Sequence, residues 1–133
     1  MAADAAQQQH EETYWERLYG AIDGCDATVV DRLFTDDATL QFNYHPPVIG
    51  RDAVRGAMEH FWSTVAAMRH TFRNVIEQGD RAVIEATCTY TRHDGVVVAL
   101  PVATVCERRG DRVSAQRIYI DMAPLESPEL LEH

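Results

Sequence analysis

The sequence predicts an α+β domain, with amphipathic helices first and antiparallel strands after them. Two observations carry this prediction. Apolar residues recur at helical spacing as far as Val65, and from Met68 onward they alternate with polar residues. Turn dipeptides then divide the alternating part of the chain: Gly79-Asp80, Asp94-Gly95 and Gly110-Asp111. Helices followed by turn-linked strands indicate an α+β fold rather than an alternating α/β fold.

Three helices are expected, at residues 11–22, 26–33 and 50–65. The first carries an apolar stripe at helical spacing: Trp15, Leu18, Tyr19 and Ile22. Asp23-Gly24 ends it, and Asp26 can cap the second helix. The stripe of the second helix is Val29, Val30 and Leu33. The stripe of the third helix is the longest: Val54, Met58, Phe61, Trp62 and Val65.

A short strand is predicted at 39–42, after a turn at Thr35-Asp36-Asp37, and Pro46-Pro47 then forces an extended loop. Four long strands follow: 68–76, 82–91, 96–106 and 113–121. Alternation places three side chains of the first long strand on one face, which we expect to point inward: His70, Phe72 and Ile76. The apolar run Val96–Cys106 predicts a strand that is buried on both faces.

Length and composition indicate one globular domain. The chain has 133 residues, of which 46% are hydrophobic and 25% charged. Its net charge is -9, and the basic pair Arg108-Arg109 has acidic neighbours, so nucleic acid is not an expected partner. We expect a flexible lead-in at 1–10, the domain at 11–125 and a tail at 126–133. The last three residues of the tail resemble the remnant of a purification tag.

Cysteine usage predicts a reducing, cytoplasmic location. The three cysteines form no CxxC motif: Cys25, Cys88 and Cys106. The first residues have neither the basic nor the apolar region of a signal peptide. The longest apolar run, Val96–Cys106, contains Pro101 and is shorter than the ~20 residues of a membrane helix. No metal site is expected, because the six histidines form neither HxH nor HExxH.

Short motifs occur along the chain in the order of a known family: Phe34–Thr39, Pro46-Pro47, Gly50–Val54, Gly79-Asp80, Asp94-Gly95, Leu100-Pro101 and Gln116–Asp121. In this order and spacing the chain resembles the nuclear transport factor 2-like (NTF2-like) superfamily, and in particular its SnoaL-like branch, over residues 11–125. The resemblance implies a cone-shaped fold, in which three N-terminal helices pack on a strongly curved antiparallel sheet around a pocket. It also implies a homodimer that forms through the outer face of the sheet.

Members of the superfamily include ketosteroid isomerases, limonene epoxide hydrolases, polyketide cyclases, dehydratases and non-catalytic binders, so the fold does not give the function. Ketosteroid isomerase chemistry needs a carboxylate base, a tyrosine and a neutral aspartate. Aligned on the Phe34–Thr39 motif, these positions hold Phe42, Leu18 (next to Tyr19) and Ala103. The resemblance therefore does not extend to isomerase chemistry by the usual residues.

Limonene epoxide hydrolase chemistry needs an Asp-Arg-Asp set, helped by a tyrosine and an asparagine. The aligned positions hold apolar or thiol side chains instead: Ala86, Cys88, Ile118, Leu40 and Phe42. These residues predict an apolar pocket floor. Such a floor suits a hydrophobic ligand, and it equally suits side chains that simply fill the cone.

His70 and Asp121 are the candidate catalytic residues. An imidazole near neutral pH can act as acid or base, and the resemblance implies an acidic residue at the end of the last long strand. A histidine satisfied by the backbone and a capping carboxylate are the structural alternatives. Asp121 also has the opposite strand parity to Ile118, so it reaches the pocket only if a bulge intervenes.

Further residues are candidates for ligand binding, on the helical stripes, on the predicted floor and before Pro46-Pro47: Trp15, Tyr19, Phe42, Tyr44, His45, Met58, Trp62, Cys88 and Ile118. Of these, Tyr44 or His45 could orient a polar group at the pocket mouth. Aromatic residues at helical spacing are more often core, and Cys88 is interpreted as a buried thiol. Three residues before Asp94-Gly95 are predicted at the surface: Tyr90, Arg92 and His93.

Two functions are consistent with these residues. The first is a cofactor-independent cyclase, isomerase or dehydratase that acts on a hydrophobic substrate by acid/base catalysis. The second is a non-catalytic domain that binds an apolar ligand in the same cone. The two differ in whether an ionisable group lies deep in the pocket.

Overall fold

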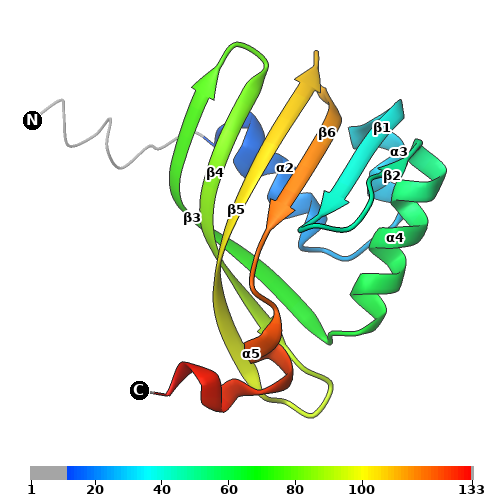
Figure 1. The fold of residues 1–133 in the computed structure, drawn as a ribbon. Helices are drawn as coiled ribbons and strands as arrows, with labels where there is room; N and C mark the ends of the chain where they lie inside the picture. Colours follow the sequence, from blue (N-terminus) through cyan, green and yellow to red (C-terminus); the bar gives the residue numbers. More distant parts are fainter. Residues whose placement is uncertain (1–11, 133) are drawn as a thin grey trace, which may run out of the picture.

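The computed structural model of the chain describes residues 12–132, so the predicted lead-in at 1–10 lies outside the described residues. A curled sheet wraps around helices on its concave side (Figure 1). The elements, in chain order, are α2 (Tyr14–Ile22), α3 (Thr28–Leu33), β1 (Phe34–Phe42), β2 (Val48–Ile49), α4 (Arg51–Ser63), β3 (Ala67–Gln78), β4 (Arg81–Thr91), β5 (Val97–Arg109), β6 (Arg112–Tyr119), α5 (Ala123–Glu126) and a 3₁₀ turn (Pro128–Leu131).

The sheet has the strand order β2-β1-β6-β5-β4-β3. All neighbouring strands are antiparallel except β1 and β6, which run parallel. The predicted α+β fold is confirmed, but the sheet is mixed rather than wholly antiparallel. The parallel pair arises because the chain leaves β1 through β2 and α4, starts β3 at the far edge, and returns by hairpins until β6 lies beside β1.

The helices cover the concave face and supply much of the core. α2 begins with a capping box, in which the Thr13 hydroxyl accepts the Glu16 N–H and the Glu16 carboxylate accepts the Thr13 N–H. The predicted stripe of α2 is buried, and Val54, Met58 and Trp62 of α4 are buried with it. Since all three helices expected from apolar periodicity form, their stripes are the part of the core that the sequence predicts best.

β1 starts at Phe34, so the turn predicted at Thr35-Asp36-Asp37 is wrong. These polar residues lie in the strand, where the pairing with β6 shifts register between Phe34 and Thr39. Two of the side chains remain solvated and pair with arginines, Asp36 with Arg51 and Asp37 with Arg109. A bulge thus accommodates residues whose composition favours a turn.

A second bulge lies in β3, and beyond it the side chains face the opposite way from the prediction. The register of β3 with β4 shifts between Phe72 and Asn74. His70 and Phe72 lie on the inner face as expected, but Ile76 is 60% exposed and Val75 takes the inward position. One extra residue reverses the alternation beyond it, and the sequence alone gives no sign of where that residue lies.

β5 is buried on one face only, which contradicts the two-sided burial predicted for Val96–Cys106. Buried and more exposed positions alternate along it, because the helices cover only the concave side of the sheet. Val97, Ala99 and Pro101 are exposed on the convex face. Among the helices of residues 12–132, none is long and apolar enough to span a membrane.

Candidate functional site

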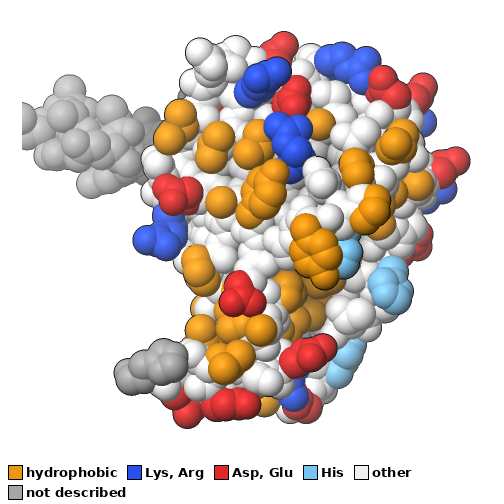
Figure 2. All heavy atoms as spheres, viewed as in Figure 1, with side chains coloured by type: hydrophobic (Ala, Val, Ile, Leu, Met, Phe, Trp, Pro, Cys, Tyr) orange, Lys and Arg blue, Asp and Glu red, His pale blue; other side chains and the backbone are white. Residues whose placement is uncertain are grey.

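A cavity of about 870 Å³ lies between the concave face of the sheet and the helices. Its walls come from α2, α4, all the long strands and the segment around α5. Figure 2 shows it as a hollow with hydrophobic side chains inside and histidines beside it. Most of the lining is apolar, including Leu40, Phe61, Val102 and Met122. Of the residues expected to form an apolar floor, Leu40, Phe42 and Ile118 line the cavity, whereas Ala86 and Cys88 do not. The apolar lining is suited to a hydrophobic ligand.

His70 is held in the cavity wall by Asp23. The imidazole Nδ1 lies 2.6 Å from Asp23 Oδ1, and the backbone N–H of His70 donates to Asp23 Oδ2 at 2.7 Å. Both side chains are largely buried, at 9% and 15% exposure. Nε2 of His70 has no hydrogen-bond partner among residues 12–132, so it is the ring nitrogen available to a ligand.

The pair forms because the end of α2 meets the middle of β3. Asp23 is the C-cap of α2, where the helix dipole disfavours a negative charge. An imidazolium placed against the carboxylate offsets that cost. His70 is brought there by its inward position in β3, directly opposite Cys88 of β4.

The contacts of His70 raise its pKa. Desolvation by burial lowers it, but the hydrogen bond with Asp23 and the adjacent Cys88 outweigh this effect and raise the pKa from 6.5 to about 9. His70 is therefore an imidazolium at neutral pH. In that state Nε2 carries a proton and can donate it, so His70 is suited to act as an acid.

Cys88 and Tyr90 surround the same pair from β4. Cys88 Sγ lies 4.0 Å from Nδ1 of His70, the nitrogen already bound to Asp23, and the residue is fully buried. A thiol on that nitrogen and outside the cavity lining is not placed to attack a ligand. Tyr90 does line the cavity, and desolvation and the neighbouring Cys88 raise its pKa, so its phenol stays neutral.

A second polar group lies on the inner face of β5 and β6. Gln116 Nε2 donates to the Tyr19 hydroxyl at 2.8 Å, and this hydroxyl lies 3.6 Å from Cys106 Sγ. Thr104 adjoins the Tyr19 hydroxyl as well. Desolvation raises the pKa of Tyr19 well above 10, so its hydroxyl keeps its proton. The Tyr19 ring also contacts the His70 ring edge-on, at 4.7 Å between centroids, and so joins the two polar groups.

Residues 15–116 of the chain match the family model described as the SnoaL-like domain. This chain belongs to the SnoaL-like domain family. The match covers most of the chain and includes α2, α4 and the strands that carry His70 and Gln116. No curated protein matches the chain in sequence.

Solved structures share the fold of this SnoaL-like domain. A putative SnoaL-like polyketide cyclase from Jannaschia sp. CCS1 is 16% identical, with a TM-score of 0.74 over 89% of this chain and 95% of that chain. A protein with a ketosteroid isomerase-like fold from Catenulispora acidiphila, in complex with trimethylamine, is 20% identical (TM-score 0.72; 83% and 86%). An LEH-like epoxide hydrolase from M. tuberculosis is 18% identical (TM-score 0.73; 88% and 86%). At these identities the likeness shows the NTF2-like fold alone.

The cavity of this SnoaL-like domain is lined by most of the residues that the sequence predicted for the site. His70 and six of the predicted ligand-binding residues line it: Tyr19, Phe42, His45, Met58, Trp62 and Ile118. Leu18, which aligns with the tyrosine of the ketosteroid isomerases, is buried but does not line the cavity. Its neighbour Tyr19 lines the cavity instead.

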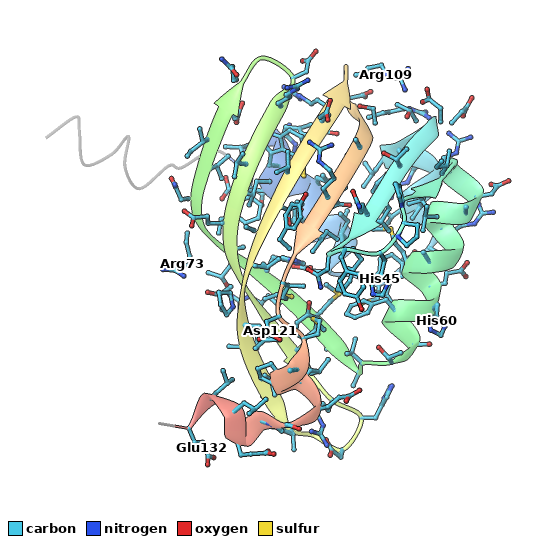
Figure 3. The ribbon with its side chains drawn as sticks, in the orientation of Figure 1. His45, His60, Arg73, Arg109, Asp121 and Glu132 are labelled. Atoms are coloured by element: carbon cyan, nitrogen blue, oxygen red, sulfur yellow. The ribbon has the colours of Figure 1, made fainter. Side chains whose placement is uncertain are left out.

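Four predicted residues are not part of the lining. Asp121 is exposed beyond β6, where its carboxylate accepts the Ala123 N–H at the start of α5 (Figure 3). No bulge follows Ile118 to bring it inward, so the capping alternative describes its position. Trp15, at 1% exposure, packs in the core, and Cys88 lies behind His70. Tyr44 is 87% exposed and stacks on His45.

The sequence did not predict several polar residues at or beside this cavity, among them Asp23, Tyr90, Thr104 and Gln116. Asp23 was interpreted only as the end of a helix, and Tyr90 was wrongly placed at the surface. Strand parity could have found Tyr90 and Thr104, because they alternate with exposed or half-exposed positions. It could not have found Gln116, because a register shift between β5 and β6 interrupts the alternation after Val113. Across residues 12–132, no group of three or more His, Cys, Asp or Glu side chains is arranged to hold a metal ion.

Proposed function

We propose that the cavity is the active site of a cofactor-independent enzyme of the cyclase, isomerase or dehydratase group, acting on a hydrophobic small molecule by acid/base catalysis. The observation that carries the proposal is the Asp23–His70 pair in an otherwise apolar wall. An ionisable group beside a ligand cavity, fixed by a second charged group, is typical of catalytic sites. The family membership and the polyketide cyclase and epoxide hydrolase among the similar folds support the same class.

His70 is the proton donor in this proposal. Asp23 occupies Nδ1 and keeps the ring protonated, so Nε2–H can donate to a substrate oxygen. In a dehydration, the proton passes from Nε2 to a hydroxyl oxygen as the C–O bond breaks and water leaves. The proton on the neighbouring carbon is released to solvent water, and the new double bond forms between the two carbons. Asp121 has no part, because it lies outside the cavity.

Dehydration of a hydrophobic β-hydroxy ketone, 4-hydroxy-4-phenylbutan-2-one, tests the proposal through the ultraviolet absorbance of the conjugated product. We expect the protein to accelerate the reaction, and His70→Gln to reduce the acceleration about 100-fold or more. Asp121→Asn is the matched control, which removes a carboxylate outside the cavity and should change nothing. Turnover that survives His70→Gln would contradict the assignment of the proton donor.

The second candidate is a non-catalytic domain that binds an apolar ligand, and the mostly apolar lining favours it. Under this alternative, hydrophobic ketones, lactones and polyketide-like acids raise the melting temperature, yet none is converted. His70→Gln then changes ligand affinity at most. A stabilising ligand that the protein converts would exclude this alternative.

We also propose a homodimer formed through the convex face of the sheet. Three large apolar side chains are exposed there, on β4, β5 and β6: Val83, Val97 and Tyr119. Exposed apolar side chains along one sheet face favour association with a second such face. Light scattering coupled to size exclusion should give the mass of two chains, and Val97→Lys should shift it toward one chain. A monomeric wild-type protein would contradict the proposal.

A further inference from the structure

Gln116 has a polar atom that nothing in the described chain satisfies. The residue is 2% exposed, and its Nε2 is bound to Tyr19. Its Oε1 is buried without a hydrogen-bond partner among residues 12–132. A buried carbonyl oxygen that lacks a donor is costly, so it calls for a partner such as a water molecule or a ligand group. Gln116 is part of this cavity wall.

The Gln116 amide is placed with its nitrogen toward Tyr19. Its Nε2–H donates to the Tyr19 hydroxyl at 2.8 Å, and this hydroxyl also contacts Cys106 Sγ at 3.6 Å. Tyr19 is itself 3% exposed and cannot swing away without disturbing the core. The free end of the amide is therefore an acceptor, and the group that would satisfy it is a donor.

Strand pairing places Gln116 at the end of the cavity away from its mouth. The exposed lining residues mark the mouth, with His45 and Pro46 after β1 and His93 and Glu126 near the β4–β5 hairpin. Gln116 pairs with Cys106, near the opposite end of β5. Along the sheet, His70 lies between the β4–β5 hairpin and the level of Gln116. It pairs with Cys88, which in turn pairs with Leu100 near the start of β5.

Apart from Tyr19 and Thr104, the wall around Gln116 is apolar. Leu40 pairs directly with Gln116 across β1 and β6, and Ile118 and Val102 lie on the same face. In such surroundings a neutral donor is favoured over a cation, because an unpaired charge is costly to bury. A hydroxyl group on a hydrophobic framework meets both requirements.

We propose that Gln116, oriented by Tyr19, is a recognition site for a hydroxyl group at the closed end of the cavity. The substrate class that follows is a hydrophobic molecule, such as a phenol or a ring alcohol. It enters hydroxyl first and leaves its reacting carbons beside His70. This inference rests on the proposed function for the identity of the reacting end, but the recognition itself is a matter of binding and is tested without turnover.

Three probes of one shape test it: 2-naphthol, which carries a donor, 2-methoxynaphthalene, which carries only an acceptor, and 2-methylnaphthalene, which carries neither. Titration calorimetry gives the affinity of each. We expect the wild-type protein to bind 2-naphthol about fivefold to tenfold more tightly than the other two, as for one neutral hydrogen bond in an apolar site. Gln116→Met, which keeps the size and removes the amide, should bind all three alike.

Two further variants separate the site from its neighbours. Tyr19→Phe releases the amide, so the preference for 2-naphthol should fall while 2-methoxynaphthalene gains. His70→Gln should retain the preference, because the hydroxyl lies at Gln116. Loss of the preference in His70→Gln but not in Gln116→Met would overturn the proposal. Melting temperatures and circular dichroism confirm that each variant is folded.

The remaining outcomes distinguish this proposal from the proposed function. Equal wild-type affinities for the three probes, or a preference for 2-methoxynaphthalene, would overturn hydroxyl recognition alone and leave His70-dependent turnover intact. If none of the three probes binds, both hydroxyl recognition and the use of the cavity as a ligand site would be overturned. If the protein shows no turnover but still prefers 2-naphthol, only the proposed catalytic function would be overturned.

Discussion

The imidazole Nδ1 of His70 lies 2.6 Å from Oδ1 of Asp23, although 47 residues separate the two in sequence. The same carboxylate also accepts the backbone N–H of His70. Through these two bonds the end of α2 is tied to the middle of β3, and an ionisable ring is fixed in the wall of an apolar cavity. Stability and protonation are therefore linked at this one contact, and under the proposed function catalysis depends on it too.

Stability should fall as the pH rises from 6.5 to 9. Below pH 6.5 His70 is protonated in both the folded and the unfolded chain, so the raised pKa contributes fully to stability. Between 6.5 and about 9 only the folded chain keeps the proton, and the contribution is lost. The raised pKa corresponds to a loss on the order of 3 kcal/mol. Urea denaturation at several pH values measures it.

His70→Gln is the control for that measurement, because it removes the titrating ring. The variant should lack this pH dependence while it shares every other titration with the wild-type protein. The difference between the two free energies of unfolding isolates the histidine. Parallel pH profiles would mean that the Asp23 contact does not favour the imidazolium.

Asp23→Asn should lower the pKa of His70 rather than simply unfold the site. Asparagine can still accept the backbone N–H of His70 but carries no charge, so desolvation of the buried ring dominates. In NMR titrations of the ring protons we expect a midpoint near 9 in the wild-type protein and a midpoint near or below 6.5 in the variant.

Turnover gives the second measurement on Asp23→Asn. If His70 donates a proton, the rate of the variant should fall at pH 8 and recover in more acidic solution, because the ring regains its proton there. Asp121→Asn removes a carboxylate outside the cavity and should leave both the titration and the rate unchanged. A uniform loss of rate at every pH would indicate a structural role only.

Arg108 anchors the other end of α2. Its guanidinium lies 4.3 Å from the centre of the Tyr14 ring and 5.8 Å from that of Trp15. Arg108→Met keeps the aliphatic packing and removes the charge, so we expect a loss of about 1 kcal/mol. A double-mutant cycle with Tyr14→Leu should return a coupling of roughly 0.5–1 kcal/mol. Additive effects of the two changes would exclude a cation–π interaction.

Local patterns predicted α2, α3, α4 and the four long strands β3 to β6, because the helical stripes and the alternating strands each bury one face, whereas β2 and α5 were not predicted. His70 could be found in this way, since its parity in β3 places it inward. Its partner could not, because Asp23 is polar, follows the apolar stripe, and meets His70 only when α2 packs on β3. Nothing in the local sequence distinguishes this aspartate from one that merely ends a helix.

Asp121 illustrates the opposite error. The resemblance to the family drew attention to an acidic residue at the end of the last long strand, but alternation from Ile118 already placed it on the other side. The structure follows the alternation. Bulges are the one device that breaks such parity, and the pairings of β1 with β6, of β3 with β4 and of β5 with β6 each contain a register shift that the local sequence does not signal.

Asn43 provides a test of how the cavity mouth is built. Its backbone has φ of 52°, in the left-handed region, and its side chain imitates a strand neighbour. Oδ1 accepts the Ile120 N–H at 2.9 Å and Nδ2 donates to the Ile120 carbonyl at 2.8 Å, so the loop that carries His45 is tied to the segment before α5. Asparagine tolerates this backbone conformation better than most residues do.

Asn43→Gly and Asn43→Ala separate the two contributions of this residue. Glycine keeps the backbone conformation and loses both hydrogen bonds, so it should cost about 1–3 kcal/mol. Alanine loses the same bonds and also strains the left-handed backbone, so it should cost about 1 kcal/mol more. Urea denaturation measures both. Equal stability of the glycine variant and the wild-type protein would show that the bonds to Ile120 contribute nothing, and equal costs for glycine and alanine would show that the backbone is unstrained.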